Sequence, residues 1–175
     1  MTSISLITWL DARDRMLLTR WVVPAQTSRH VRCFWQVLTH LGGATATIAA
    51  CVLPILCGGT VARAVGTRAL AVLVLSHLMV QVVKRSIGRP RPSQVGVSCR
   101  LAEEPDRFSF PSGHAAAGMS IALAYAAACP GLAAPLVLLA ALVGASRVCL
   151  GVHYPGDVLV GQLLAWSASL VLRVA

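Results

Sequence analysis

The chain has 175 residues, of which 57% are hydrophobic and only 12% are charged. A soluble domain of this length does not need so many apolar side chains for one core, so the composition indicates an integral membrane protein. The formal net charge of +9 is typical of cations that flank membrane spans. No basic stripe is interleaved with aromatic residues, so we expect no nucleic-acid binding.

The first 25 residues mix aspartate and arginine with leucine, isoleucine, tryptophan and methionine. We predict that residues 1–25 form an amphipathic helix that lies on the membrane surface and does not span it. No basic region precedes the first apolar residues, so we expect no cleaved signal peptide.

Five apolar stretches follow, at residues 34–57, 61–83, 114–129, 132–146 and 156–174. Each is long enough, or nearly so, to cross about 30 Å of hydrocarbon at about 1.5 Å per residue. Pro130 and Gly131 join the third and fourth stretches into a helical hairpin. We therefore predict a single all-α domain over residues 1–175, a polytopic membrane helical bundle of five to six transmembrane helices.

Residues 84–113 interrupt the apolar pattern, and the glycines and prolines of this segment argue against one continuous helix. We predict an active-site loop region here. Counting the crossings on either side puts the ends of the second and fourth spans and the starts of the third and fifth on one membrane face. Three polar clusters therefore meet on that face.

The first cluster is KRSIGRPRP at residues 84–92, with the cations Lys84, Arg85, Arg89 and Arg91. Alone, such a run is typical of a positive anchor at the end of a span. The alternative is an oxyanion site, because lysine supplies a point charge and arginine a bidentate fork to phosphate oxygens.

The second cluster is PSGH at residues 111–114, at the predicted start of the third span. A helix N-terminus presents free backbone N–H groups to an anion, and Gly113 lets the anion approach closely. Ser112 is either an N-cap or part of this site. His114 is an ionisable group at the membrane boundary, where such a group needs a partner or a function.

The third cluster is SRVCLGVHYPGD at residues 146–157, which contains Arg147, His153 and Asp157. The spacing of four lets Asp157 accept a hydrogen bond from one ring nitrogen of His153. The other nitrogen is then free to attack an electrophile. The alternative is a stop-transfer arginine, an interfacial histidine and a helix-capping aspartate.

Two histidines and an aspartate could also form a metal site of the two-histidine, one-carboxylate type. Cations on the same face would repel a divalent metal and attract a phosphate instead. These cations are Lys84, Arg85, Arg89, Arg91 and Arg147. We therefore predict no metal and no other cofactor.

Together the three clusters resemble the signature of the type 2 phosphatidic acid phosphatase family, which shares its site with the vanadium haloperoxidases. The first part, a lysine, six residues and Arg-Pro, is matched by Lys84, Arg91 and Pro92. The second part is Pro-Ser-Gly-His at residues 111–114. The third part, Ser-Arg, five residues, His, three residues and Asp, is matched by Ser146, Arg147, His153 and Asp157.

The resemblance implies metal-independent hydrolysis of a phosphomonoester or diphosphate in two steps. His153 would attack phosphorus and form a phosphohistidine, with Asp157 orienting its ring. His114 would protonate the leaving oxygen and then activate water. The phosphoryl oxygens would be held by Lys84, Arg91, Ser112, the Gly113 backbone N–H and Arg147.

The substrate that the resemblance implies is a lipid phosphate, with its head in the cationic pocket and its tail in the bilayer. Candidates are undecaprenyl diphosphate, phosphatidic acid and phosphatidylglycerophosphate. The main alternative is a lipid phosphotransferase, because transfer to an alcohol shares the first half-reaction. A haloperoxidase has no need of a membrane-embedded chain, and a binding protein has no need of these residues at these spacings. The sequence leaves the oligomeric state open.

The orientation rests on the arginines, most of which fall on the face of the motifs. The positive-inside rule then favours a site on the cytoplasmic side of the inner membrane. Bacterial family members often act on the outer leaflet, so both orientations stay open. Cys33 and Cys99 lie outside the spans on that face and could pair in an oxidising compartment. His40 and His77 lie within spans, where we expect interhelical hydrogen bonds.

Overall fold

The computed structural model describes residues 3–24, 26–96, 101–102, 104 and 106–174. Within these ranges the regular structure is helical, and the only extended pairing is one bridge between Pro90 and Phe108. The all-α prediction is confirmed. The elements are α1 (Ser3–Trp21), α2 (Arg29–Leu41), α3 (Ala44–Cys57), α4 (Thr60–Ile87), η1 (Pro92–Val95), α5 (Gly113–Ala128), η2 (Pro130–Leu132), α6 (Ala133–Cys149) and α7 (Pro155–Val174).

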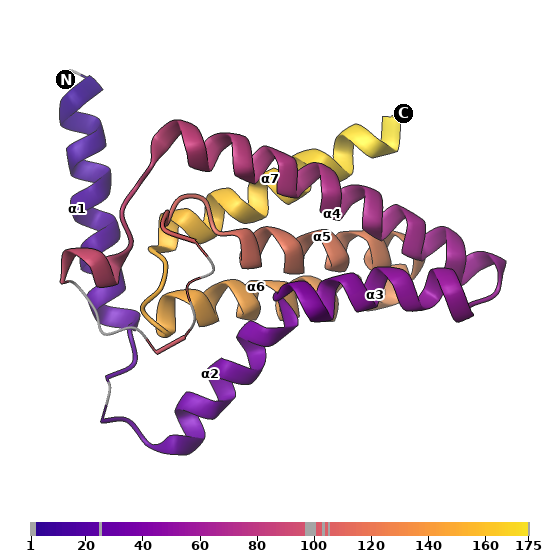
Figure 1. Ribbon diagram of the computed structural model, residues 1–175, viewed down its shortest axis with the longest axis horizontal. Coiled ribbons are helices and arrows are strands. Elements are labelled where there is room, and N and C mark those ends of the chain that lie inside the picture. The colour runs from indigo at the N-terminus through magenta and orange to yellow at the C-terminus, as the bar shows by residue number, and fades with distance from the viewer. Residues whose placement is uncertain (1–2, 25, 97–100, 103, 105, 175) are drawn as a thin grey trace.

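Helix α5 lies at the centre of the bundle, in contact with α3, α4, α6 and α7 (Figure 1). Its sequence, GHAAAGMSIALAYAAA, is dominated by alanine, and small side chains let helices in a membrane approach closely. The hydroxyls of Ser76 on α4 and Ser120 on α5 share a hydrogen bond of 2.8 Å. His77 is exposed and pairs with Gln81 one turn along the same helix, at 3.2 Å, so the interhelical bond expected for His77 is wrong.

Three helical segments are long and apolar enough to cross a membrane, namely Thr60–Ile87, Pro130–Cys149 and Pro155–Arg173. The pair α2 and α3 makes a fourth if it counts as one bent span. Helix α5 has 16 residues, about 24 Å at about 1.5 Å per residue, and is shorter than a typical span. Among the described residues the structure thus has three to four candidate spans, and the predicted five to six are not confirmed.

The predicted first span, residues 34–57, is two helices bent by 46° at Gly42 and Gly43. The break has a packing reason. A Cβ atom on Gly42 would lie 2.5 Å from Cγ1 of Val143 and 2.7 Å from the carbonyl oxygen of His114. Glycine therefore lets the backbone of this break press against the start of α5, beside the PSGH motif.

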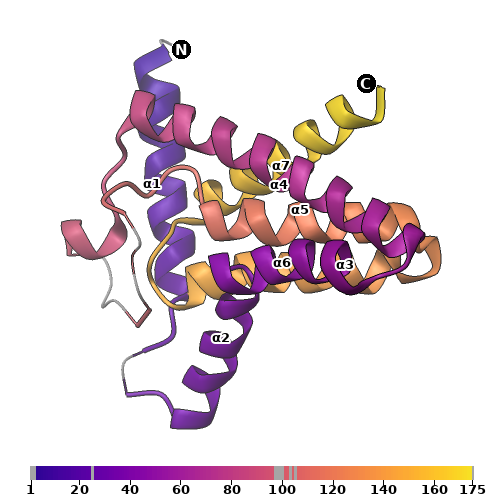
Figure 2. The same ribbon diagram turned by 45° about the vertical axis from the view of Figure 1, so that its right-hand side comes forward.

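Helix α1 crosses the end of the bundle instead of running along it (Figures 1 and 2). It is not among the segments that could span a membrane. Leu18 is fully buried in a cluster with Val148 and Tyr154. The Val23 N–H donates a 2.8 Å hydrogen bond to the carbonyl of Cys149. The helix is thus docked on the bundle, and its amphipathic placement on the membrane surface stays a prediction.

Four helix ends meet where α1 crosses the bundle, namely the last turns of α4 and α6 and the first turns of α5 and α7 (Figure 1). Helix α4 runs to Ile87, so Lys84 lies in its last turn and not in a loop. Gly88 ends the helix in the left-handed conformation, with φ 62°, a backbone state that favours glycine. The segment that follows brings Arg89 and Arg91 to the starts of α5 and α7.

Candidate active site

His153 and Asp157 lie at the centre of this junction. His153 is in the turn between α6 and α7, and Asp157 is in the first turn of α7, where its Oδ2 accepts a 2.8 Å hydrogen bond from the Tyr154 N–H. Nδ1 of His153 is 3.5 Å from the same Oδ2, and both side chains are buried. The Ser109 hydroxyl also donates to Oδ2 and lies 3.5 Å from Nδ1. The ring therefore turns one nitrogen toward the carboxylate.

The other ring nitrogen, Nε2, faces Arg91, whose Nη1 is 3.3 Å away. A guanidinium group only donates hydrogen bonds, so Nε2 is the acceptor and the proton of the neutral ring is on Nδ1. Burial and the charges of Arg147 and Arg91 lower the pKa of His153 to about 4, although Asp157 raises it. The ring is neutral at pH 7, with its lone pair aimed at a cation.

Three buried cations surround this part of the site: Lys84, Arg91 and Arg147, with 4%, 0% and 1% of their surface exposed. Arg91 Nη1 also donates to the carbonyl of Val152 at 2.9 Å. Arg147 Nη1 donates to the Thr39 hydroxyl at 2.7 Å. Three buried cationic side chains so close together make the local electrostatic potential positive, which favours the binding of an anion.

Asp106 is a carboxylate that bridges two of these cations. Its Oδ2 is 2.7 Å from Nζ of Lys84, and its Oδ1 is 3.0 Å from Nη2 of Arg91. Its carbonyl oxygen accepts a 2.8 Å hydrogen bond from Nε of Arg91. Burial alone would raise the pKa of Asp106, but the two cations hold it below its ordinary value. Asp106 is thus an anion in contact with two of the predicted phosphate ligands.

The PSGH motif forms the start of α5, as predicted. Ser112 is the N-cap, its hydroxyl accepting a 3.5 Å hydrogen bond from the Ala115 N–H, and its own N–H donates to the carbonyl of Asp157 at 2.9 Å. Gly113 is the first residue of α5, with no atom within 4 Å of the place a Cβ would take. His114 follows and is half-buried beside the α2–α3 break. Ser112 is therefore the N-cap of α5, and its predicted contact with a phosphoryl oxygen stays a prediction.

Arg89 holds the second oxygen of Asp157. Its Nη1 is 2.7 Å from Asp157 Oδ1 and 2.7 Å from Asp14 Oδ2, and its Nη2 is 2.7 Å from Asp11 Oδ1. Its guanidinium carbon lies 3.9 Å from the centre of the Tyr154 ring. Burial would lower the pKa of Arg89, but the three carboxylates raise it above its ordinary value. From the sequence, Arg89 was predicted only as one of the cations of the first cluster.

Several partners in this site were not predicted from the sequence. They are Asp11, Asp14, Thr39, Asp106 and Ser109. One signal could have pointed to the aspartates: the chain has only six acidic residues against fifteen lysines and arginines. In an apolar chain each carboxylate is therefore a candidate partner for a buried cation. No comparable signal marks Thr39 or Ser109.

In the part of the chain that the structure describes, no three histidine, cysteine, aspartate or glutamate side chains come together as a metal ion would require. Cys99 lies outside the described residues, so its pairing with Cys33 stays a prediction.

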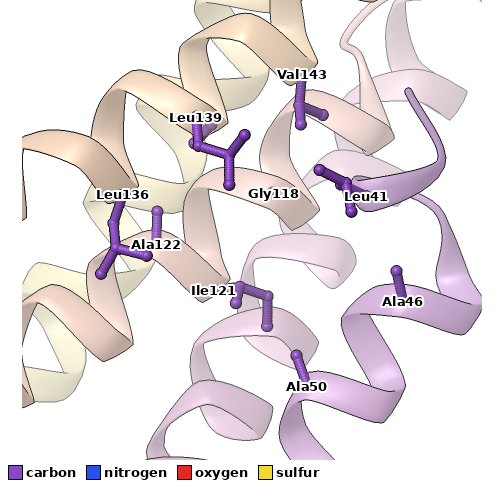
Figure 3. A pocket seen from close by; sticks show the side chains of 10 residues that line it. Leu41, Ala46, Ala50, Gly118, Ile121, Ala122, Leu136, Leu139 and Val143 are labelled. Carbon is purple, nitrogen blue, oxygen red and sulfur yellow. The ribbon is translucent and has the colours of Figure 1, made fainter. Parts of the chain in front are cut away.

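An apolar cavity of about 190 Å³ lies beside the site, between the α2–α3 break, α5 and α6 (Figure 3). Gly118 lies one turn after His114, and Val143 one turn before Arg147. Carbon atoms dominate its wall, so the cavity suits hydrocarbon and not phosphate. It is lined by Leu41, Ala46, Ala50, Gly118, Ile121, Ala122, Leu136, Leu139, Ala140 and Val143.

Curated proteins similar to this chain are lipid phosphatases. Decaprenylphosphoryl-5-phosphoribose phosphatase of Mycobacterium tuberculosis is 35% identical over 98 residues, which are 56% of this chain and 54% of that protein. Lipid A 1-phosphatase of Rhizobium etli is 33% identical over 115 residues, which are 63% of this chain and 50% of that protein. The chain thus spans about half the length of the curated relatives it matches.

Two crystal structures share the fold over nearly the whole chain. The PAP2-type phosphatidylglycerolphosphate phosphatase of Bacillus subtilis has a TM-score of 0.74 and 25% identity, covering 94% of this chain and 86% of that chain. LpxE of Aquifex aeolicus has a TM-score of 0.75 and 23% identity, covering 92% and 93%. The sequence profile of the PAP2 superfamily matches residues 65–175, more than half of the chain and every motif of the site. This chain therefore belongs to the PAP2 superfamily.

Proposed function

We propose that this protein is a membrane phosphatase that hydrolyses a lipid phosphomonoester or diphosphate through a phosphohistidine on His153. The orientation of the His153 ring carries the proposal. Its Nδ1 faces Asp157, and its Nε2 faces the buried cations. A neutral imidazole with its lone pair aimed into a cationic cluster suits attack on phosphorus. Membership of the PAP2 superfamily supports the hydrolytic class.

In the first step, Nε2 of His153 forms a bond to phosphorus while the bond from phosphorus to the leaving oxygen breaks. A protonated His114, a form that the negative charge of the bound phosphate favours, gives its proton to that oxygen, so the lipid product leaves without an added charge. Asp157 keeps its hydrogen bond with Nδ1–H and stabilises the positive charge that develops on the ring. The phosphoryl group is then on His153.

In the second step, water attacks the phosphohistidine. His114 accepts a proton from the water, and the phosphorus–nitrogen bond breaks. Inorganic phosphate leaves, and His153 returns to its neutral form. No step requires a metal or another cofactor.

The phosphoryl oxygens bind to Lys84, Arg91 and Arg147 in this proposal. Because Arg91 Nη1 is already 3.3 Å from Nε2, an oxygen held by Arg91 would bring phosphorus next to the attacking nitrogen. The phosphoryl group must share Lys84 and Arg91 with Asp106. The N–H of Gly113, on the open side of α5, supplies a further donor, while Ser112 supports it as the N-cap.

The substrate we propose is a lipid whose phosphate lies at the membrane face. The site is at the end of the bundle where apolar helices stop, so a headgroup can reach it while the chain stays in hydrocarbon. The curated relatives are named for different lipid phosphates, which supports the class and leaves the headgroup open. Undecaprenyl diphosphate, phosphatidic acid and phosphatidylglycerophosphate are the candidates to test first.

The membrane placement is part of the same proposal. We count α5, in the middle of the bundle, as a further membrane-crossing segment, which gives five spans with the bent pair α2 and α3 counted as one. Helix α1 lies on the membrane surface. The protein lies in the inner membrane. The excess of arginine around the site favours the cytoplasmic side.

The test is phosphate release by the detergent-purified protein from each candidate lipid, with EDTA, with vanadate and with two histidine variants. His153→Ala should abolish release, and His77→Ala, an exposed histidine far along α4, should not. We expect release that survives EDTA and is lost with vanadate. Release that needs a divalent metal, or that His153→Ala retains, would contradict the proposal. In the same assay with a lipid labelled in its phosphoryl group, label recovered on an added alcohol instead of in free phosphate would favour a phosphotransferase.

A further inference from the structure

We propose that Asp14 of α1 and Arg89 are a positioning pair for Asp157, so that helix α1 helps to set the orientation of the His153 ring. The inference rests on the proposed function, because ring orientation matters only if His153 reacts. Arg89 lies 2.7 Å from both Asp157 and Asp14, so the pair would act on His153 through Asp157.

The Asp157 carboxylate divides its contacts between its two oxygens. Oδ1 is held by Arg89 at 2.7 Å. Oδ2 faces the Tyr154 N–H, the Ser109 hydroxyl and the His153 ring. Because the carboxylate is fully buried, water cannot replace a hydrogen bond that is lost when the carboxylate rotates. Arg89 therefore fixes which oxygen is available to His153.

Asp14 ties Arg89 to the start of α7. Its Oδ2 is 2.7 Å from the same Nη1 that contacts Asp157, and its Oδ1 accepts a 2.7 Å hydrogen bond from the Gly156 N–H. Gly156 directly precedes Asp157. A Cβ on Gly156 would lie 2.9 Å from Asp14 Oδ2, so the close approach of α1 requires a small residue there. One carboxylate thus holds both the guanidinium and the helix end on which Asp157 stands.

One side of α1 carries the residues that contact Arg89 and the start of α7. Asp11, Asp14 and Leu18 have the spacing of three and four that puts residues on one side of a helix. Leu18 is fully buried with Tyr154, while Asp11 reaches Arg89 Nη2 at 2.7 Å and is more exposed than Asp14. A helix that only anchored the protein to lipid would not need two carboxylates turned toward a half-buried arginine.

The test is a double-mutant cycle on phosphate release, because a positioning residue that acts through Asp157 loses its effect once Asp157 is altered. Asp14→Asn keeps the shape of the side chain and its acceptor for Gly156 but removes the charge that pairs with Arg89. We expect kcat to fall roughly 10- to 100-fold with KM nearly unchanged, since small errors in orientation carry such costs. In the Asp157→Asn background the same substitution should lower kcat less than about twofold.

The controls separate this proposal from folding and from the proposed function. Arg20→Gln, an exposed change further along α1, should leave kcat unchanged. Asp14→Glu, which keeps the charge, should recover part of the lost rate, and melting temperatures in detergent report the fold of each variant. Equal losses from Asp14→Asn in both backgrounds, or no loss in either, would overturn the pairing while an inactive His153→Ala still upheld the nucleophile. An active His153→Ala would instead overturn the nucleophile itself.

Discussion

Nε2 of His153 and Nη1 of Arg91 are 3.3 Å apart, so the proposed nucleophile is in contact with a proposed phosphate ligand. The contact fixes the tautomer, since a guanidinium cannot accept a hydrogen bond. It also means that a phosphoryl oxygen bound to Arg91 would lie within reach of the attacking atom. The proposed nucleophile and the proposed phosphate site therefore share the contact between His153 and Arg91.

A substitution of Arg91 that keeps its positive charge should therefore still slow phosphate release. Arg91→Lys keeps the charge but loses the planar fork that contacts Asp106, Val152 and His153. We expect kcat/KM for phosphate release to fall about 100-fold or more. Arg85→Lys, at an exposed position in the last turn of α4, should be neutral. Equal activity of the two variants would contradict the role given to Arg91.

Removing the Ser109 hydroxyl should loosen the Asp157 carboxylate. Ser109→Ala deletes a hydrogen bond to Oδ2 of that buried group, and hydrogen bonds to charged groups are worth about 1.5 to 3 kcal/mol. We expect kcat to fall roughly tenfold with the protein still folded. Ser167→Ala, an exposed serine on α7, is the matched control. An unchanged kcat in Ser109→Ala would show that Asp157 is held well enough without it.

The stability of the protein should depend on pH through His153. Its pKa is lowered from 6.5 to about 4 by burial, so the folded protein binds this proton less readily than the unfolded chain. The stabilisation is full above pH 6.5 and is lost as the pH falls from 6.5 toward 4, by about 3 kcal/mol at most. Free energies of unfolding in detergent across this range should fall more steeply for the wild type than for His153→Gln. Parallel curves for the two proteins would contradict the buried, neutral ring.

The α2–α3 break should tolerate no side chain at Gly42. Gly42→Ala places a methyl group against Val143 and the His114 carbonyl, so one of them must move, at a cost of about 1 to 3 kcal/mol. We expect a lower melting temperature and a lower rate, because the start of α5 carries His114. Gly59→Ala, where no atom lies within 4 Å, should cost neither. A Gly42→Ala protein as stable and as active as Gly59→Ala would contradict this packing.

The helical fold and the meeting of the three clusters could be predicted because each depends on short-range information. Apolar stretches mark the helices, and the parity of crossings puts Lys84, His114 and Asp157 at one end of the bundle. His153 faces Asp157 because Asp157 follows it by four positions, across a helix start. These relations can therefore be predicted from local patterns in the sequence.

The partners of those residues could not be predicted, because they come from distant parts of the chain. Asp14 contacts Gly156 and Arg89 only after α1 has docked across the bundle. Thr39 reaches Arg147 because the chain bends at Gly42 and Gly43, and hydropathy does not register a bend inside an apolar run. Contacts of this kind depend on tertiary packing, for which the sequence offers no local pattern.

The most direct test of the central claim is to identify the phosphorylated residue. The purified protein is incubated briefly with a lipid phosphate labelled in its phosphoryl group, quenched in base, digested and mapped. We expect an acid-labile, base-stable label on His153 that is absent from His153→Ala. Label on another residue, or no label in a protein that releases phosphate from the same lipid under these conditions, would contradict the account.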